Sequence, residues 1–305
     1  MWRYILGRVL YSVAVVLGVS VLVFCLIRLS GDPTPLFLPP ESSLADIQRA
    51  RHELGFDRPL LVQYLDFLAH AGRGDFGRSL RHGQPAMRLV LERVPATLEL
   101  GAVALGLSLV VALPLGVVTA LRRGSALDAG GLLVSLFGQS FPVFWLGIML
   151  ILVFSEKLGV LPASGRGSFL HLIMPAVVLA SYPMAIITRL LRSTLIDVLG
   201  EDYIRTARGK GLGERLVICR HALRNASIPV VTIVGLQVGA LLGGAVITEE
   251  VFAYPGIGRL AIQAIANRDF PVVQAFVVLM ALFIVGINLL VDLSYTFLDP
   301  RVRRA

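Results

Sequence analysis

Six apolar stretches constrain this chain more than any other feature of its sequence. Each carries few or no charged residues and can span the ~30 Å hydrocarbon core of a bilayer, which takes about 20 helical residues. They are Val9–Ile27, Leu100–Leu121, Ala129–Ser155, Gly167–Thr188, Ala226–Thr248 and Phe270–Val291. Because hydrocarbon offers a bare backbone no hydrogen-bond partner, each is expected to be helical. The sequence therefore predicts an all-α polytopic membrane protein with six transmembrane helices.

Composition supports the same class. Hydrophobic residues make up 56% of the chain and charged residues only 16%, against about 25% charged in soluble domains. The first apolar stretch has 19 residues and no A-x-A-like site after it. Because a secretory signal has an apolar core of about 7–15 residues, we expect a retained first helix and not a cleaved signal.

The basic residues predict the orientation. If the N-terminus is cytoplasmic, the cytoplasmic pieces (residues 1–8, 122–128, 189–225 and 299–305) carry 15 Lys and Arg. The opposite pieces (30–97, 156–166 and 249–269) carry 12, of which eight lie in one long loop, where the positive-inside rule is weak. We therefore predict that both termini are cytoplasmic. The same rule explains the net charge of +8 without a nucleic-acid partner.

Residues 30–97 form a loop too long to be a plain connector. "SLAD" from Ser43 to Asp46 predicts a capped helix start, and Gly55 predicts its end. Pro59 suits the first turn of a second helix, in which Leu60, Leu61, Tyr64, Leu65 and Leu68 share a face. We expect a small folded external element. A docking or gating role for a soluble partner is the alternative.

No catalytic constellation is present in the sequence. It lacks HExxH, GxSxG and the phosphate-binding G-x-x-x-x-G-K-[ST]. Ser140 in "GQSFP" lacks the second Gly and a nearby His, so a polar packing contact is favoured over a nucleophile. Cys25 and Cys219 form no metal-ligand or CxxC spacing. We predict a chain that is not an enzyme and that itself binds no cofactor or metal.

Ionisable groups inside a span would indicate ion coupling. Glu99, His171 and Asp292 all lie near the predicted ends of spans. The fifth span contains a glycine ridge, Gly235, Gly239 and Gly243, whose four-residue spacing places all three on one face. A tight helix contact is the favoured interpretation, and the same ridge suits a seam between two membrane subunits beside a pathway.

The segment "EDYIRTARGKGLGERLVICRHALRN" (201–225) interrupts the apolar pattern. Ile204 and Ala207 share a helical face, Gly211 and Gly213 break the helix, and Glu214 starts another. This helix–Gly–helix pattern predicts an ordered surface projection suited to a groove in a partner protein.

The segment resembles the cytoplasmic "EAA" loop of ABC importer permeases, E-A-A-x3-G-x9-I-x-L-P, aligned on Gly211. The spacing, Ala207, Gly211 and Leu223 match. Arg205 stands where the pattern has an acidic residue, so a salt bridge made there in other subfamilies does not carry over. The departures are similar to the dipeptide/oligopeptide/nickel (DppB-like) permeases. So are "GDP" (31–33), "GDFGRSL" (74–80), "ERVPATLEL" before the second span, "VFAYPGIGRL" (251–260) and "LDPRVR" (298–303).

The resemblance implies a type I ABC importer permease fold in a bacterial inner membrane. It implies domains 1–29 (first helix), 30–97 (external loop), 98–298 (core with coupling loop 189–225) and 299–305 (cytoplasmic tail). The implied partners are a second (DppC-like) permease subunit, two ATPase subunits that bind ATP and Mg, and an extracytoplasmic substrate-binding protein, besides membrane lipid. The implied ATPase-coupling residues are Tyr203, Arg205, Thr206, Ala207, Arg208, Lys210, Gly211 and Leu212.

The function expected from the resemblance is ATP-driven import of di- or oligopeptides, or of glutathione- or nickel-type solutes. An ion-coupled secondary transporter or channel is the alternative, and it predicts transport by this chain alone. An intramembrane enzyme is a third possibility, and it requires a nucleophile or metal set that the sequence does not show.

Overall fold

The computed structural model describes residues 2–29, 34, 38, 42–53 and 55–298. Among these residues the regular elements are all helices. Five helices are long and apolar enough to cross a bilayer, and a bent pair makes six if it is one span. The expectation of an all-α polytopic chain is confirmed. The predicted tail 299–305 and the "GDP" patch at 31–33 lie outside the described residues.

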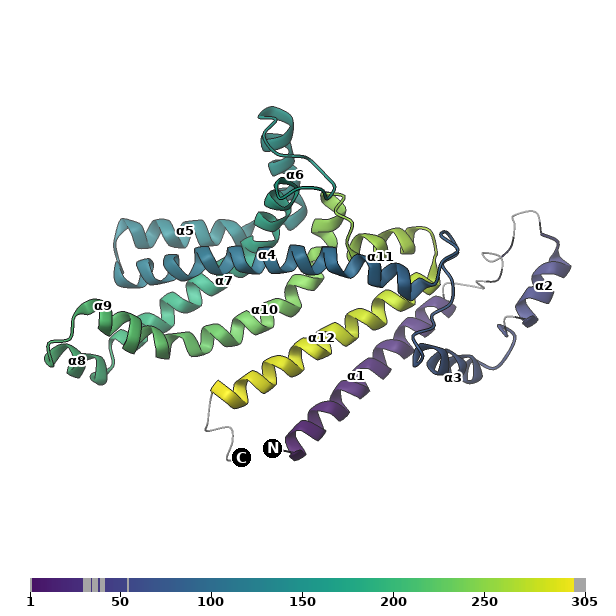
Figure 1. Cartoon of the computed structure of the whole chain (residues 1–305), viewed down its shortest axis with the longest axis horizontal. Helices are drawn as coiled ribbons and strands as arrows, with labels where there is room; N and C mark the ends of the chain where they lie inside the picture. The colour runs from purple at the N-terminus through teal and green to yellow at the C-terminus, as the bar shows by residue number, and fades with distance from the viewer. Residues whose placement is uncertain (1, 30–33, 35–37, 39–41, 54, 299–305) are drawn as a thin grey trace. The chain divides into compact units, whose positions relative to one another are not determined.

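Figure 1 labels the helices in chain order. The chain divides into two compact units, residues 1–95 with 256–286 and residues 96–255 with 287–305. The first unit contains α1 (Trp2–Leu29), α2 (Leu44–Glu53), α3 (Leu60–Ala71), the start of α4 (Ala86–Leu121), α11 (Ile257–Ala266) and most of α12 (Phe270–Leu298). Its core brings α4, α11 and α12 together through the buried side chains of Val90, Ile257, Leu260 and Val272.

The segment that the sequence predicts to be external forms the two helices expected there. The Asp46 backbone N–H donates to Ser43 Oγ (3.2 Å), while the Ser43 Oγ and backbone N–H donate to Asp46 Oδ2 (2.6 and 3.2 Å), a reciprocal cap that starts α2. The two hydrogen bonds that Ser43 donates to the carboxylate lower the pKa of Asp46. Gly55 follows α2 with a φ of 69°, the left-handed conformation that favours glycine after a helix.

Only part of the predicted face of α3 packs. Leu60, Leu61 and Leu65 are exposed. Tyr64, from the predicted face, and Phe67, which the spacing did not include, pack their rings on Phe24 of α1, with centroids 5.4 and 6.0 Å apart. Aromatic side chains bury more area than leucine, so they determine which face packs.

The second unit contains most of α4, α5 (Ala126–Ser140), α6 (Val143–Leu150) with its π-helical continuation η2 (Ile151–Lys157), and α7 (Leu170–Leu199). Next come α8 (Asp202–Gly209), α9 (Glu214–Leu216), the π-helical η3 (Val217–Ala222), α10 (Leu223–Val251) and the end of α12. Helix α7 packs against α5 and α10, and it is the most buried of the apolar helices. Pro175 and Pro183 lie buried inside this helix. Proline is tolerated within membrane helices because neighbouring helices and polar side chains satisfy the backbone groups it leaves free.

The third predicted span is not one continuous helix. Helix α5 ends at Ser140, and the axis bends by 103° before α6. Phe141 is extended (φ −95°, ψ 137°), because the ring of the following Pro142 disfavours the helical conformation at the residue before it. The sequence contained this signal, but the uninterrupted hydrophobicity of 129–155 concealed it.

Helices α7 and α10 extend beyond their apolar stretches. Helix α7 continues from the predicted end at Thr188 to Leu199, and the helical segment leading into α10 begins at Glu214. The predicted loop 189–225 is therefore helical at both ends. Hydropathy marks where a helix can lie in lipid, whereas a helix continues into water wherever its backbone and side chains stay satisfied.

Candidate functional site

Helix α8 is fixed to the second unit through two side chains. Ile204 is 0% exposed and Ala207 is 7% exposed. Both belong to a core cluster with Leu191 and Leu195 of α7 and Val217 of η3. Because residues three apart lie on one helical face, the predicted Ile204/Ala207 face is the one that packs.

The opposite face of α8 is polar and exposed. Tyr203, Arg205, Thr206 and Arg208 all lie on it. The Arg205 guanidinium contacts the Asp202 carboxylate at 2.6 Å, and the Thr206 Oγ1 donates to the Asp202 carbonyl oxygen at 3.0 Å. This face presents cationic and hydroxyl groups at the surface of the chain.

A glycine turn ends α8. Gly211 has a φ of 76°, and its N–H donates to the Arg208 carbonyl at 2.9 Å. Lys210 is exposed beside it, whereas Leu212 packs against the α8 core cluster. The eight residues predicted for ATPase coupling therefore form one helix and its turn.

Two contacts that sequence reasoning missed hold α8 to the following helix. Arg208 donates from Nε and Nη2 to the two carboxylate oxygens of Glu214, at 2.7 and 3.3 Å. The Asn225 Nδ2 donates to the Tyr203 hydroxyl at 2.7 Å. The opposite charges of Arg208 and Glu214, six residues apart across the glycines, were the only available signal.

The helix that leads to α8 is braced by an ion pair. Arg192 of α7 donates from Nε and Nη2 to the carboxylate of Asp128 in α5, at 2.7 and 2.8 Å. The Asp128 side chain is 7% exposed, and it also accepts from the Gly124 N–H at 2.9 Å. This bidentate arrangement fixes orientation as well as distance.

One glycine of the α10 ridge packs against another helix, and the other two have no neighbouring side chain among the described residues. A Cβ on Gly235 would lie 2.6 Å from Cγ2 of Val291 in α12, so the two helices approach closely there. At Gly239 and Gly243 a Cβ would meet no heavy atom of the described residues within 4 Å. The ridge therefore leaves two glycines available to a partner.

A polar cluster lies at the other end of α10. Arg166, in the loop before α7, donates from Nε and Nη2 to Oε2 of Glu99 at 2.9 and 2.5 Å, and the Tyr254 hydroxyl donates to the same oxygen at 3.3 Å. Nearby, the Thr97 hydroxyl donates to Oε1 of Glu249 at 2.6 Å, and both side chains are buried. The span analysis placed Glu99 at a helix end but did not predict its partners.

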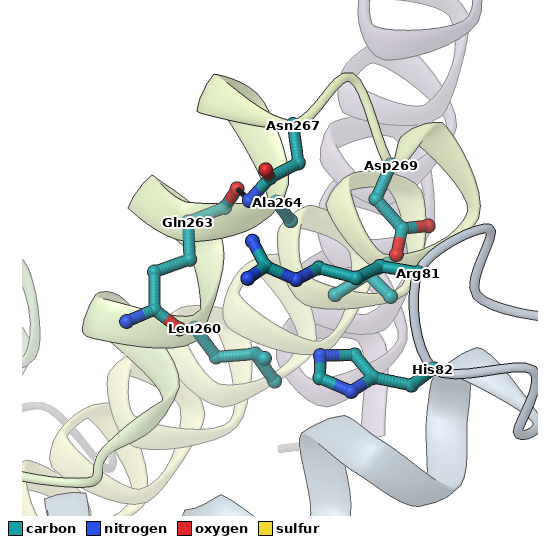
Figure 2. A pocket seen from close by; sticks show the side chains of 8 residues that line it. Arg81, His82, Leu260, Gln263, Ala264, Asn267 and Asp269 are labelled. Carbon is teal, nitrogen blue, oxygen red and sulfur yellow. Dashed lines mark hydrogen bonds between the residues drawn. The ribbon is translucent and has the colours of Figure 1, made fainter. Parts of the chain in front are cut away.

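Figure 2 shows a separate pocket in the first unit, of about 190 Å³. The Arg81 guanidinium points across it toward Asn267, with the His82 ring beside Leu260. Asp269 borders the pocket, and its carboxylate accepts from the Ser79 hydroxyl and the Leu80 N–H. That carboxylate anchors the loop 78–82 to the residues between α11 and α12.

In the described part of the chain, no group of three or more His, Cys, Asp or Glu residues is arranged to hold a metal ion. The Ser140 hydroxyl donates to the carbonyl of Leu136 in its own helix, an ordinary contact for a serine inside a helix.

Comparison with known proteins identifies the family. Residues 112–304 match the family described as "Binding-protein-dependent transport system inner membrane component", and residues 1–101 match its N-terminal companion. The chain belongs to this family. The resemblance inferred from the sequence is confirmed.

The relatives of this permease match it along its whole length. The di/tripeptide transport system permease protein DppB of Pseudomonas aeruginosa (strain UCBPP-PA14) is 42% identical, covering 99% of each chain. The oligopeptide transport system permease protein AppB of Bacillus subtilis (strain 168) and the glutathione transport system permease protein GsiC of Salmonella choleraesuis (strain SC-B67) are each 40% identical with the same coverage.

Solved structures share the permease fold. The inward-facing MetNI methionine ABC transporter aligns with a TM-score of 0.60 at 20% identity, over 70% of this chain and 97% of that one. This likeness shows the fold, whereas the family match and the full-length relatives show that the chain is a multi-pass permease subunit of an ABC importer in a bacterial inner membrane.

Proposed function

We propose that this permease forms half of a translocation pathway for di- or oligopeptides, with a second DppC-like permease subunit as the other half. A substrate-binding protein delivers the peptide outside, and two ATPase subunits bind ATP and Mg inside. The relatives named for di/tripeptide, oligopeptide and glutathione transport, at 40% identity or more over the whole chain, support this substrate class.

In this proposal α8 is the coupling helix. The observation that carries it is the division of α8 into a buried side and an exposed polar side. Ile204 and Ala207 anchor the helix in the core of the second unit, while Arg205 and Lys210 face outward. A partner that pushes on the exposed side moves α7 and α10 with it, as a rigid-body transition requires.

One observation favours the ion-coupled alternative. Glu249 is a fully buried carboxylate near the end of α10, and an ionisable group in a membrane helix is a candidate for proton or sodium coupling. Its hydrogen bond from Thr97 gives it an ordinary structural role as well. Energy dependence separates the two functions.

The test is reconstitution in liposomes. The permease with its three kinds of partner should accumulate a labelled dipeptide only when ATP is supplied to the ATPase side. The permease alone should accumulate none, with or without a proton or sodium gradient. Gradient-driven uptake by the chain alone would replace this proposal with a secondary transporter.

A further inference from the structure

A polar pocket of about 480 Å³ opens at the end of the second unit that is opposite α8. Tyr254, whose hydroxyl donates to Glu99 in the pocket wall, lies just after the last residue of α10. Helix α8 lies before the first residue of α10. The 29 residues of α10 separate these ends by about 43 Å at 1.5 Å per residue. The pocket is lined by Glu99, Arg166, Gly167, Ser168, Phe169 and Leu172.

The two charged side chains of the pocket are paired through only one carboxylate oxygen. Both hydrogen bonds from Arg166 and the one from Tyr254 end on Oε2 of Glu99. Oε1 of Glu99 accepts no hydrogen bond from any residue that the structure describes. A guanidinium carries five N–H donors, so the pair retains capacity for a ligand that bears both charges.

The carboxylate is held in place from the protein interior. The Tyr254 side chain is 0% exposed, and burial raises its pKa to about 12. The hydroxyl therefore stays protonated and donates to Glu99. Two residues before Glu99, the buried bond between Thr97 and Glu249 joins α4 to α10 at 2.6 Å. These buried contacts fix Glu99 at the pocket wall.

Stability does not account for the ion pair. The Arg166 and Glu99 side chains are 45% and 36% exposed, and exposed pairs add little to stability. Beside them Phe169 is 69% exposed, which leaves an apolar surface next to the charges. Charged groups and an adjacent apolar surface are the ordinary composition of a small-molecule site.

We propose that this pocket binds the two termini of a free peptide during transport. Oε1 of Glu99 accepts from the α-ammonium group, and the Arg166 guanidinium donates to the α-carboxylate. The termini are what peptides of different sequence have in common, and Phe169 contacts the variable side chain. A dipeptide spans about 7 Å, which the cavity accommodates. This inference rests on the proposed peptide-transport function.

Direct binding to the assembled permease–ATPase complex tests the inference. The complex is placed in lipid nanodiscs without the substrate-binding protein, and equilibrium binding of radiolabelled dialanine is measured at up to millimolar concentration. Glu99→Gln and Arg166→Gln should each weaken binding about tenfold, the loss expected for one charge-assisted hydrogen bond. Arg88→Gln, in an exposed ion pair with Glu92 in the first unit, is the matched control and should bind as the wild type does.

Blocked peptides separate recognition from a structural role. N-acetyl-dialanine should bind the wild type weakly and lose nothing further in Glu99→Gln, and dialanine amide should behave in the same way with Arg166→Gln. Equal losses for free and blocked peptides would show that the pair only supports the fold. That result, or a wild-type complex that binds no dialanine, would overturn the proposal.

The proposed function is measured separately with the same complex. ATP-driven dipeptide uptake after addition of the binding protein reports on transport, whatever the variants do to direct binding. If uptake occurs but Glu99→Gln and Arg166→Gln leave binding unchanged, the pocket assignment fails and peptide transport stands. If no peptide is taken up, the proposed function itself fails.

Discussion

Gly211 shows how one residue can control an exposed surface of this permease. Its φ of 76° lies in the left-handed region, which costs a residue with a Cβ about 1–2 kcal/mol. A Cβ there would meet open space among the described residues, so the cost is conformational and not steric. The strain would act on the turn that positions Lys210 and Leu212.

We expect Gly211→Ala to reduce ATP-driven uptake by perturbing this turn, while membrane insertion and expression persist. Gly213→Ala is the matched control, because Gly213 has a φ of −62° and equally open surroundings. The measurements are ATPase co-purification and transport-stimulated ATP hydrolysis. Wild-type coupling in Gly211→Ala would contradict a role for the α8 turn.

The Arg192–Asp128 pair predicts a stability effect. Asp128→Asn removes the negative charge and one of the two acceptor oxygens of a mostly buried, bidentate pair, and a hydrogen bond to a charged group contributes about 1.5–3 kcal/mol to stability. At about 2 °C per kcal/mol, we expect the apparent melting temperature of the detergent-purified protein to fall by roughly 3–6 °C.

Arg88→Gln breaks an ion pair whose side chains are 71% and 52% exposed, so it should change the melting temperature of the same preparation very little. Equal changes in melting temperature for Asp128→Asn and Arg88→Gln would mean that the Arg192–Asp128 pair contributes no more to stability than an exposed ion pair does.

At the scale of elements, the α10 glycine ridge separates internal packing from assembly. Gly235→Ala places a Cβ 2.6 Å from Val291, and overpacking of this kind costs about 1–3 kcal/mol. We expect Gly235→Ala to lower the melting temperature of the isolated permease chain. Gly239→Ala meets open space and should leave that stability unchanged.

The proposed seam between two permease subunits gives a second prediction for the same ridge. If Gly239 and Gly243 contact the other permease subunit, Gly239→Leu should reduce the amount of that subunit that co-purifies, while this chain alone remains folded. Small residues are what allow such close helix approach. Undiminished recovery of the partner in Gly239→Leu would place the seam elsewhere.

At the scale of the whole molecule, the bent α5–α6 pair decides the topology. If α5, α6 and η2 form one span, the loops before and after them lie on opposite sides of the membrane. If they form a re-entrant segment, both loops lie on the same side. Because the axis bends by 103°, the length of the apolar stretch alone does not distinguish one span from a re-entrant segment.

We expect opposite sides, with the first loop cytoplasmic. In a background with Cys25 and Cys219 replaced by Ser, Arg123→Cys should react with an impermeant maleimide only after the membrane is opened. Ser164→Cys should react in intact spheroplasts. In a separate background with only Cys25 replaced by Ser, native Cys219, which is exposed in η3, should behave like Arg123→Cys. Labelling of both loops from outside would contradict the six-span topology.

Most of the correct structural predictions concern features formed by residues that are close together in the sequence. The reciprocal cap of Ser43 and Asp46, the turn at Gly211 and the buried Ile204/Ala207 face each depend on residues within a few positions of one another. Such features are readable because their partners are adjacent in the chain. The prediction that Leu60, Leu61 and Leu65 of α3 pack was wrong, because the spacing of apolar residues does not say which of two apolar faces packs.

The sequence alone determined the class of this protein, because the length and apolarity of its stretches leave helices in a membrane as the physical solution. It also determined the family, through motifs that extend over nearly the whole chain. Only the tertiary structure decided which distant residues meet. The Glu99–Arg166–Tyr254 cluster joins positions 67 and 155 residues apart, and the Arg192–Asp128 brace spans 64. Those contacts depend on how the helices pack, which no local pattern specifies.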